Sequence, residues 1–77
     1  MDSIEAIKIL DSFLEKNPDY EEAFILRGKI HWNMNQRRFA INDYLEAIRI
    51  NPESKARILL EYANNILDFY NKDLLNP

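Results

Sequence analysis

Residues 6–18, AIKILDSFLEKNP, and residues 40–52, AINDYLEAIRINP, are two copies of one pattern. Both segments begin with Ala-Ile and end with Asn-Pro, and the matching pairs lie 34 residues apart. The 34-residue spacing continues after the Asn-Pro pairs, where Phe24 matches Ile58. A fixed period of this length indicates a repeat architecture in which each copy is one supersecondary unit.

The composition favours helices. The 77-residue chain has one Gly, no Val and no Thr, so Ile is its only β-branched residue type, and strand-forming residues are scarce. A chain of this size forms a single domain with a modest core. Because it contains no Cys, disulfides and thiolate metal sites are excluded. We therefore expect residues 1–77 to form one all-α domain that is stabilised by packing, and we expect it in the cytoplasm.

The charge distribution limits the classes of partner. The net charge is −3 and the isoelectric point is near 5.0, which is unfavourable for nonspecific binding to nucleic acid. No apolar run approaches the roughly 20 residues that a membrane span needs. Acidic residues predominate in residues 1–24 and 58–77 and basic residues in residues 25–57, which favours intramolecular or head-to-tail contacts. We expect neither a nucleic-acid nor a membrane partner.

Periodicity and helix-breaking residues predict about four helices, at residues 3–16, 20–34, 36–50 and 55–70, before an irregular tail at residues 71–77. Asp19 is expected to cap the second helix, with Glu22 completing a capping box. Asn35 is expected to end that helix in the left-handed conformation. Ser3 and Ser54 are expected to cap the first and last helices.

Three of these helices have predicted packing faces. The first carries a wide apolar stripe, formed by Ile4, Ala6, Ile7, Leu10, Phe13 and Leu14. The second is apolar on several sides, so we expect it to be the most enclosed helix. The third is expected to turn five residues inward: Ala40, Ile41, Tyr44, Ala47 and Ile48.

Residues 21–54 resemble one complete tetratricopeptide repeat. The positions that carry the resemblance are Phe24, Arg27, Gly28, His31, Ala40, Tyr44, Ala47 and Pro52. Arg27 and His31 depart from the family pattern, which has Leu and Tyr at these sites, so this part of the helix pair should be wetter. Gly28 has no side chain, and we expect it to form a tight contact between the second and third helices with Ala40 and Ala47.

The resemblance implies antiparallel helix-turn-helix repeats wound into a right-handed superhelix. Residues 1–19 then correspond to the second helix of an incomplete repeat, residues 20–54 to a complete repeat, residues 55–70 to a closing helix and residues 71–77 to a tail. Proteins of this family mostly do no chemistry and bind a peptide or a partner helix in a concave groove. The implied function is a non-enzymatic protein interaction module.

The resemblance also implies which residues face the groove: Glu22, Ile25, Lys29, Trp32, Asn33, Leu59, Ala63 and Ile66. One subset of the family clamps a C-terminal carboxylate, but Ile25 and Lys29 stand where that subset has Lys and Asn. A mixed groove is therefore expected, with Ile25 and Trp32 as apolar anchors and Lys29 as its cation. Packing of Trp32 against the neighbouring helix remains the alternative.

Two other functions stay open. The apolar faces of the first and last helices exceed what one neighbour can cover, and the alternative function is therefore a self-associating subunit, for which a homodimer is expected. A helix-turn-helix nucleic-acid binder would use Arg37, Arg38, Asn42 and Arg49, but the acidic isoelectric point argues against it. We expect no catalytic site, cofactor or metal, because His31 is the only histidine and suits a packing position.

Overall fold

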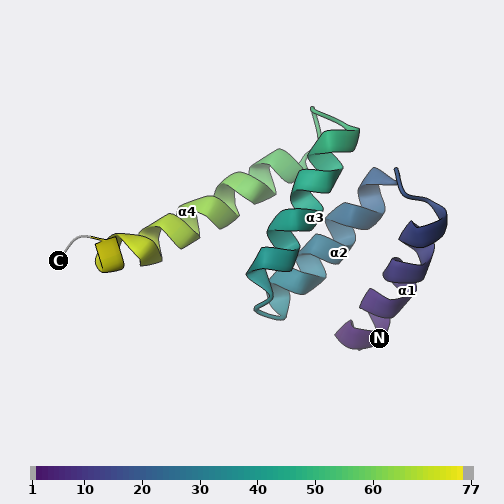
Figure 1. The fold of residues 1–77 in the computed structure, drawn as a ribbon, viewed down its shortest axis with the longest axis horizontal. Coiled ribbons are helices and arrows are strands. Elements are labelled where there is room, and N and C mark those ends of the chain that lie inside the picture. Colours follow the sequence, from purple (N-terminus) through teal and green to yellow (C-terminus); the bar gives the residue numbers. More distant parts are fainter. Residues whose placement is uncertain (1, 76–77) are drawn as a thin grey trace.

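The computed structural model describes the backbone of residues 2–75 and the side chains of residues 2–66. It contains the helices α1 (Ser3–Lys16), α2 (Glu21–Asn33), α3 (Arg37–Ile50) and α4 (Ala56–Leu75), as Figure 1 shows. No strand occurs within residues 2–75. The predicted all-α fold with four helices is confirmed.

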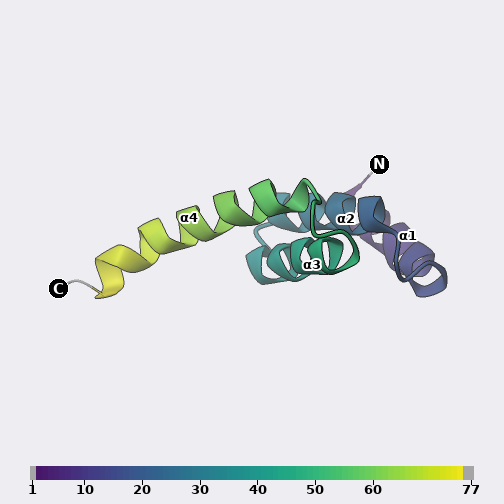
Figure 2. The ribbon, with the colours of Figure 1, turned by 90° about the horizontal axis from the view of Figure 1, so that it is seen from above.

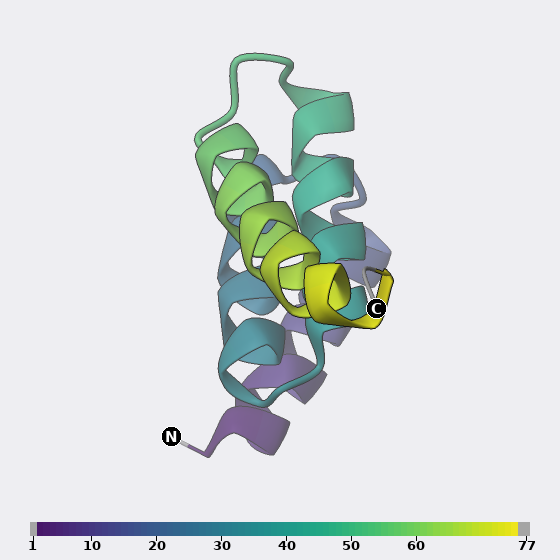
Figure 3. The same ribbon diagram turned by 90° about the vertical axis from the view of Figure 1, so that its left-hand side faces the viewer.

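The helices pack mainly against their neighbours in the sequence, and the α2–α3 contact is the most extensive. The pairs α1–α2 and α2–α3 reverse direction through short turns, and α4 runs outward from the α2–α3 pair (Figure 1). Seen from above, α3 lies on one side of α2 and of the start of α4 (Figure 2). The view along the molecule shows α4 crossing in front of the α2–α3 pair (Figure 3). This arrangement gives α2 neighbours on more than one side.

Local chemistry explains most helix limits. Asp2 caps α1, because its Oδ1 accepts a hydrogen bond from the backbone N–H of Ile4 at 2.9 Å, and the predicted cap at Ser3 is wrong. Ser54 caps the start of α4 as predicted, since its Oγ accepts from the N–H of Ala56 at 3.1 Å. Asn35 has φ of 63°, which confirms the left-handed residue between α2 and α3.

One further predicted cap and one predicted helix end are wrong. α2 begins at Glu21 after Tyr20, which makes no side-chain capping bond, so the capping box of Asp19 and Glu22 does not form. The carboxylate of Asp19 instead binds Nη2 of Arg49 on α3 at 3.0 Å. α4 continues to Leu75, so residues 71–75 are helical rather than an irregular tail, and residues 76–77 lie outside the described residues.

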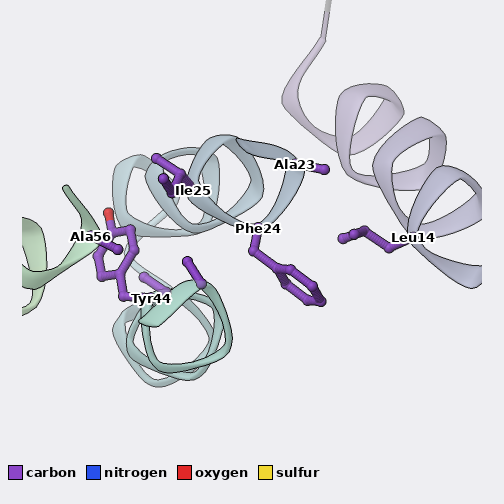
Figure 4. Packing of buried hydrophobic residues seen from close by; sticks show 8 residues of the cluster. Leu14, Ala23, Phe24, Ile25, Tyr44 and Ala56 are labelled. Carbon is purple, nitrogen blue, oxygen red and sulfur yellow. The ribbon is translucent and has the colours of Figure 1, made fainter. Parts of the chain in front are cut away.

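The core lies where α1, α2 and α3 meet the start of α4 (Figure 4). Its buried residues are Leu14, Ala23, Phe24, Ile25, Ala40, Tyr44, Ala47 and Ala56. α2 and α3 supply most of them, as the enclosed second helix predicts, whereas α1 supplies only Leu14. Ile4 and Phe13 of the predicted α1 stripe are exposed, so the helices of this chain cover that stripe only in part.

Gly28 lies at a close contact between α2 and α3. A Cβ atom at this position would lie 2.6 Å from Cε1 of Tyr44 and 3.3 Å from the carbonyl oxygen of Ala40. The predicted tight contact at Gly28 and Ala40 is therefore confirmed, and the ring that fills it is that of Tyr44. Ala47 is fully buried in the same core.

Candidate functional site

A pocket of about 250 Å³ opens between α2, α3 and α4. It is lined by Lys29, Trp32, Asn33, Tyr44, Leu59 and Tyr62, and we call it the Trp32 pocket. The α2 residues meet there because positions three and four apart lie on one face of a helix, and Leu59 and Tyr62 share a face of α4 for the same reason. The helical periodicity of α2 and α4 therefore brings these side chains together beside α3.

Four of the eight predicted groove residues come together in this pocket: Lys29, Trp32, Asn33 and Leu59. The prediction missed Tyr44 and Tyr62. Tyr62 was identifiable from its spacing of three residues after Leu59 on the same helix. Tyr44 was expected in the core, where it does lie, and its ring also reaches the floor of the pocket.

The other four predicted residues lie elsewhere. Ile25 and Ala63 are only 2% and 1% exposed, so their prediction as groove contacts is wrong. Both occupy helix faces that neighbouring helices cover, and periodicity alone does not separate such a face from an open one. Ile66 is half-buried on α4. Glu22 lies outside the Trp32 pocket and forms an exposed ion pair with Nζ of Lys55 at 3.4 Å.

Trp32 combines the two roles that its sequence position left open. Its ring packs against the core while part of it stays accessible at the pocket. The guanidinium carbon of Arg37 lies 5.1 Å from the ring centroid, which is within the range of a cation–π contact. This contact holds the ring from the α3 side, and Trp32 forms one apolar wall of the pocket.

The polar groups of the pocket are few. Lys29 is exposed at its rim, and the amide of Asn33 offers a donor and an acceptor nearby. Burial raises the pKa of Tyr44 above its ordinary value of 10.0, with the carboxylate of Asp43 adding to this shift, so its hydroxyl stays protonated at neutral pH. The pocket thus offers aromatic and aliphatic walls, one ammonium and neutral hydrogen-bonding groups.

A second polar cluster joins α1, α2 and α3. The guanidinium of Arg27 binds both carboxylate oxygens of Asp43, at 2.9 and 2.7 Å, and its third nitrogen binds Asp11 at 2.8 Å. His31 completes the cluster, with Nε2 at 3.8 Å from Asp43 and Nδ1 at 2.7 Å from Oε1 of Gln36. Arg27 and His31, the two residues that depart from the tetratricopeptide pattern, therefore both have polar partners. Hydrogen bonding to Asp43 raises the pKa of Arg27.

This cluster is structural in character. Asp43 is only 4% exposed and its carboxylate is fully engaged by a bidentate guanidinium, which leaves it no freedom to bind a substrate. Sequence reasoning missed Asp43, because an acidic residue in the middle of an amphipathic helix ordinarily faces solvent. The signal that could have found it is Arg27, a charged residue at a packing position that requires a buried partner.

Among the side chains of residues 2–66, no group of His, Cys, Asp and Glu could hold a metal ion. No described helix has the length and apolar character that a bilayer crossing requires. Comparison with known proteins finds no match to a family model, to a curated protein or to a solved structure.

Proposed function

We propose that this chain is a non-catalytic protein interaction module of the tetratricopeptide type, and that it binds a peptide segment of a partner in the Trp32 pocket. The observation that carries the proposal is the convergence of Lys29, Trp32, Asn33 and Leu59, from two helices, on one pocket. The two 34-residue matches and the close approach at Gly28 support the assignment to the repeat type.

The size of the pocket favours a peptide side chain over a cofactor. Small-molecule sites usually measure roughly 300–1,000 Å³ and enclose most of the ligand. At about 250 Å³, the Trp32 pocket accommodates one large apolar side chain. The remaining affinity would come from contacts along the exposed faces of α2 and α4.

The chemistry of the pocket defines the peptide further. The rings of Trp32 and Tyr62 and the side chain of Leu59 form apolar walls, so the anchor residue is aromatic or aliphatic. Lys29 is exposed at the rim, where it can pair with a carboxylate on the peptide. The preferred ligand is a short segment in which an apolar residue lies close to an acidic one.

The test is a selection of random twelve-residue peptides on the wild-type chain, followed by titration of one selected peptide. Trp32 is the only tryptophan of the sequence, so its fluorescence reports directly on occupation of the pocket. With the peptide labelled instead, Trp32→Ala should weaken binding roughly thirtyfold, since truncating an interface anchor costs about 2 kcal/mol or more. Lys29→Glu should weaken binding of an acidic peptide.

Arg38→Glu is the matched control, because Arg38 is an exposed cation on α3 outside the pocket, and this variant should bind as the wild type does. Circular dichroism should show the same helix content in all variants. A selection that enriches no peptide, or a peptide that binds Trp32→Ala and Lys29→Glu with unchanged affinity, would refute the proposal.

A further inference from the structure

A second groove lies between α1 and α2, away from the Trp32 pocket. It measures about 270 Å³, and its lining is almost wholly apolar: Ile9, Leu10, Phe13, Tyr20, Glu22, Ala23 and Leu26. We call it the Ile9 groove. Ile9 is 52% exposed, and Tyr20 and Leu26 are exposed to a similar degree, so the groove leaves a contiguous set of large apolar side chains in contact with water.

The internal repeat indicates what fits this groove. Three of its lining residues, Ile9, Leu10 and Tyr20, have counterparts 34 positions later, which are Asp43, Tyr44 and Ser54. All three counterparts are buried. Ile9 and Tyr20 are thus exposed in the first copy of the repeat, whereas the residues at the same positions of the second copy are covered, and half-buried Leu10 corresponds to buried Tyr44.

The element that covers the second copy is α2. Arg27 of α2 binds Asp43, and Gly28 lies directly against the ring of Tyr44. Nδ2 of Asn51 donates a hydrogen bond of 3.1 Å to Oε1 of Glu21 at the start of α2, and Ser54 also interacts with this carboxylate. The Ile9 groove is therefore expected to bind a helix in the way that α3 binds α2.

The chain holds one other helix with the register of α2. By the 34-residue spacing, Ile58 and Tyr62 of α4 are the counterparts of Phe24 and Gly28. Phe24 is buried and points into the space between α1 and α3 (Figure 4). Ile58 and Tyr62 are 72% and 61% exposed, so the face of α4 that corresponds to the covered face of α2 is open.

We propose that α4 of a second copy of this chain docks into the Ile9 groove, in the orientation that α2 adopts on α3. The side chains are complementary in size: within the chain a Gly faces Tyr44, and between copies Tyr62 would face the smaller Leu10. The charges are complementary as well, because residues 1–24 are acidic, whereas Lys55 and Arg57 lie at the start of α4.

The two halves of this contact are different surfaces, so the interface is head-to-tail. A contact of this type does not close through a two-fold axis, and each copy that docks its α4 leaves another Ile9 groove open. Association should therefore increase with concentration and produce assemblies larger than a dimer. The proposed contact shares Tyr62 with the Trp32 pocket, whereas Ile9 and Ile58 do not line that pocket, so variants at these two positions test the contact separately.

The test uses the 77-residue chain and one variant in each half of the contact, Ile9→Asp and Ile58→Asp. Light scattering after size exclusion should give the wild type a mass that rises from tens to hundreds of micromolar. Each variant should associate at least about tenfold more weakly, because it places an unpaired carboxylate in an apolar interface. An equimolar mixture should form a complex of two chains and no larger species, since it retains one intact α4 and one intact Ile9 groove.

Leu45→Asp is the matched control, because Leu45 is an equally exposed aliphatic residue on α3, and it should associate as the wild type does. Circular dichroism of each variant checks that it is folded. A wild type that keeps the mass of one chain at the highest concentration overturns the proposal. So does a mixture of folded variants that forms no complex, or a Leu45→Asp variant that loses association as completely as the others.

Discussion

Gly28 sets the distance between α2 and α3, and a larger residue there should destabilise the fold. On an exposed helical site, Gly→Ala gains about 1 kcal/mol from helix propensity. At Gly28 the new methyl would lie 2.6 Å from the buried ring of Tyr44, and overpacking of this kind costs about 1–3 kcal/mol. We expect Gly28→Ala to lower the free energy of unfolding in urea, and Gly28→Leu to lower it further.

The substitution Asn42→Ala, at an exposed position of α3, measures the propensity term alone and should be neutral or stabilising. The double variant of Gly28→Ala with Tyr44→Leu should recover part of the loss, because the smaller side chain leaves room for the methyl. Equal stability of Gly28→Ala and the wild type would show that the two helices can separate at no cost.

Asp43 and Asp11 bind the same guanidinium, yet their removal should have unequal effects. Asp43 is buried, so Asp43→Asn leaves Arg27 with an amide group in place of a carboxylate, a loss of about 1–3 kcal/mol. Asp11 is exposed, and an exposed ion pair contributes only about 0.2–1 kcal/mol. Urea denaturation of Asp43→Asn and Asp11→Asn compares the two losses directly.

An Asp11→Asn variant that loses as much stability as Asp43→Asn would indicate that both arms of the cluster are equally desolvated. The substitution pair Arg27→Leu with Asp43→Leu tests the cluster as a whole. Replacing a buried ion pair by apolar residues is often neutral or stabilising, so this double variant should be more stable than Asp43→Asn alone.

At the level of the helices, Glu21 links the start of α2 to the turn before α4. Hydrogen bonds from Ser54 and Asn51 lower the pKa of this carboxyl below its ordinary value of 4.5. Because the folded pKa is lower than the unfolded one, the contribution to stability is complete above pH 4.5 and is lost as the pH falls through the folded pKa. The thermal midpoint of the wild type should therefore fall on acidification through this range.

The variant Glu21→Gln should have a lower thermal midpoint than the wild type near neutral pH, and the two midpoints should converge in acid. Glu53→Gln removes a charge from the same turn and controls for the general loss of negative charge. A difference between Glu21→Gln and the wild type that stays constant from neutral to acidic pH would exclude the proposed linkage.

The sequence predicts the helices better than it predicts their contacts. The two Asn-Pro pairs and Asn35 locate the turns, because these residues restrict the backbone locally. The capping role of Asp19 was mispredicted because Asp19 binds Arg49, a residue that is distant in the sequence. α4 extends beyond Tyr70 because no proline or glycine interrupts residues 71–75.

Only half of the predicted groove residues line the Trp32 pocket, because the sequence does not show which helices cover which faces. Register on one helix identified Lys29, Trp32 and Asn33 together, but the exposure of Ile25 depends on which neighbours cover α2. A single periodicity does not contain that information. The partner of Arg27 could not be predicted from the sequence either. Asp43 lies on another helix, and only the packing of α2 on α3 brings the two residues together.

In the whole molecule, stability should be graded along the chain. α1 contributes only Leu14 to the buried core and packs mainly on α2, whereas α2 and α3 supply most of the core. Segments with few buried contacts open without global unfolding. Native-state hydrogen exchange should give the amides of α1 an opening free energy at least about 1.4 kcal/mol below that of α2, which is a tenfold difference in protection.

Exchange of α1 and α2 at the same opening free energy would contradict this gradient and indicate a single cooperative unit. The variant Asp11→Asn sharpens the measurement, because it removes the ion pair that ties α1 to Arg27. It should speed exchange in α1 while leaving the protected amides of α2 unchanged.

The pairing of each helix with its successor also affects how the chain acquires its structure during synthesis. Contacts between neighbours in sequence close short loops at little entropic cost, and they do not require the C-terminal end of the chain. The α2–α3 hairpin, with its Gly28–Tyr44 contact and its Arg27–Asp43 pair, is complete once residue 50 has left the ribosome. The order of emergence therefore matches the order of packing, and folding can proceed from the N-terminal end while translation continues.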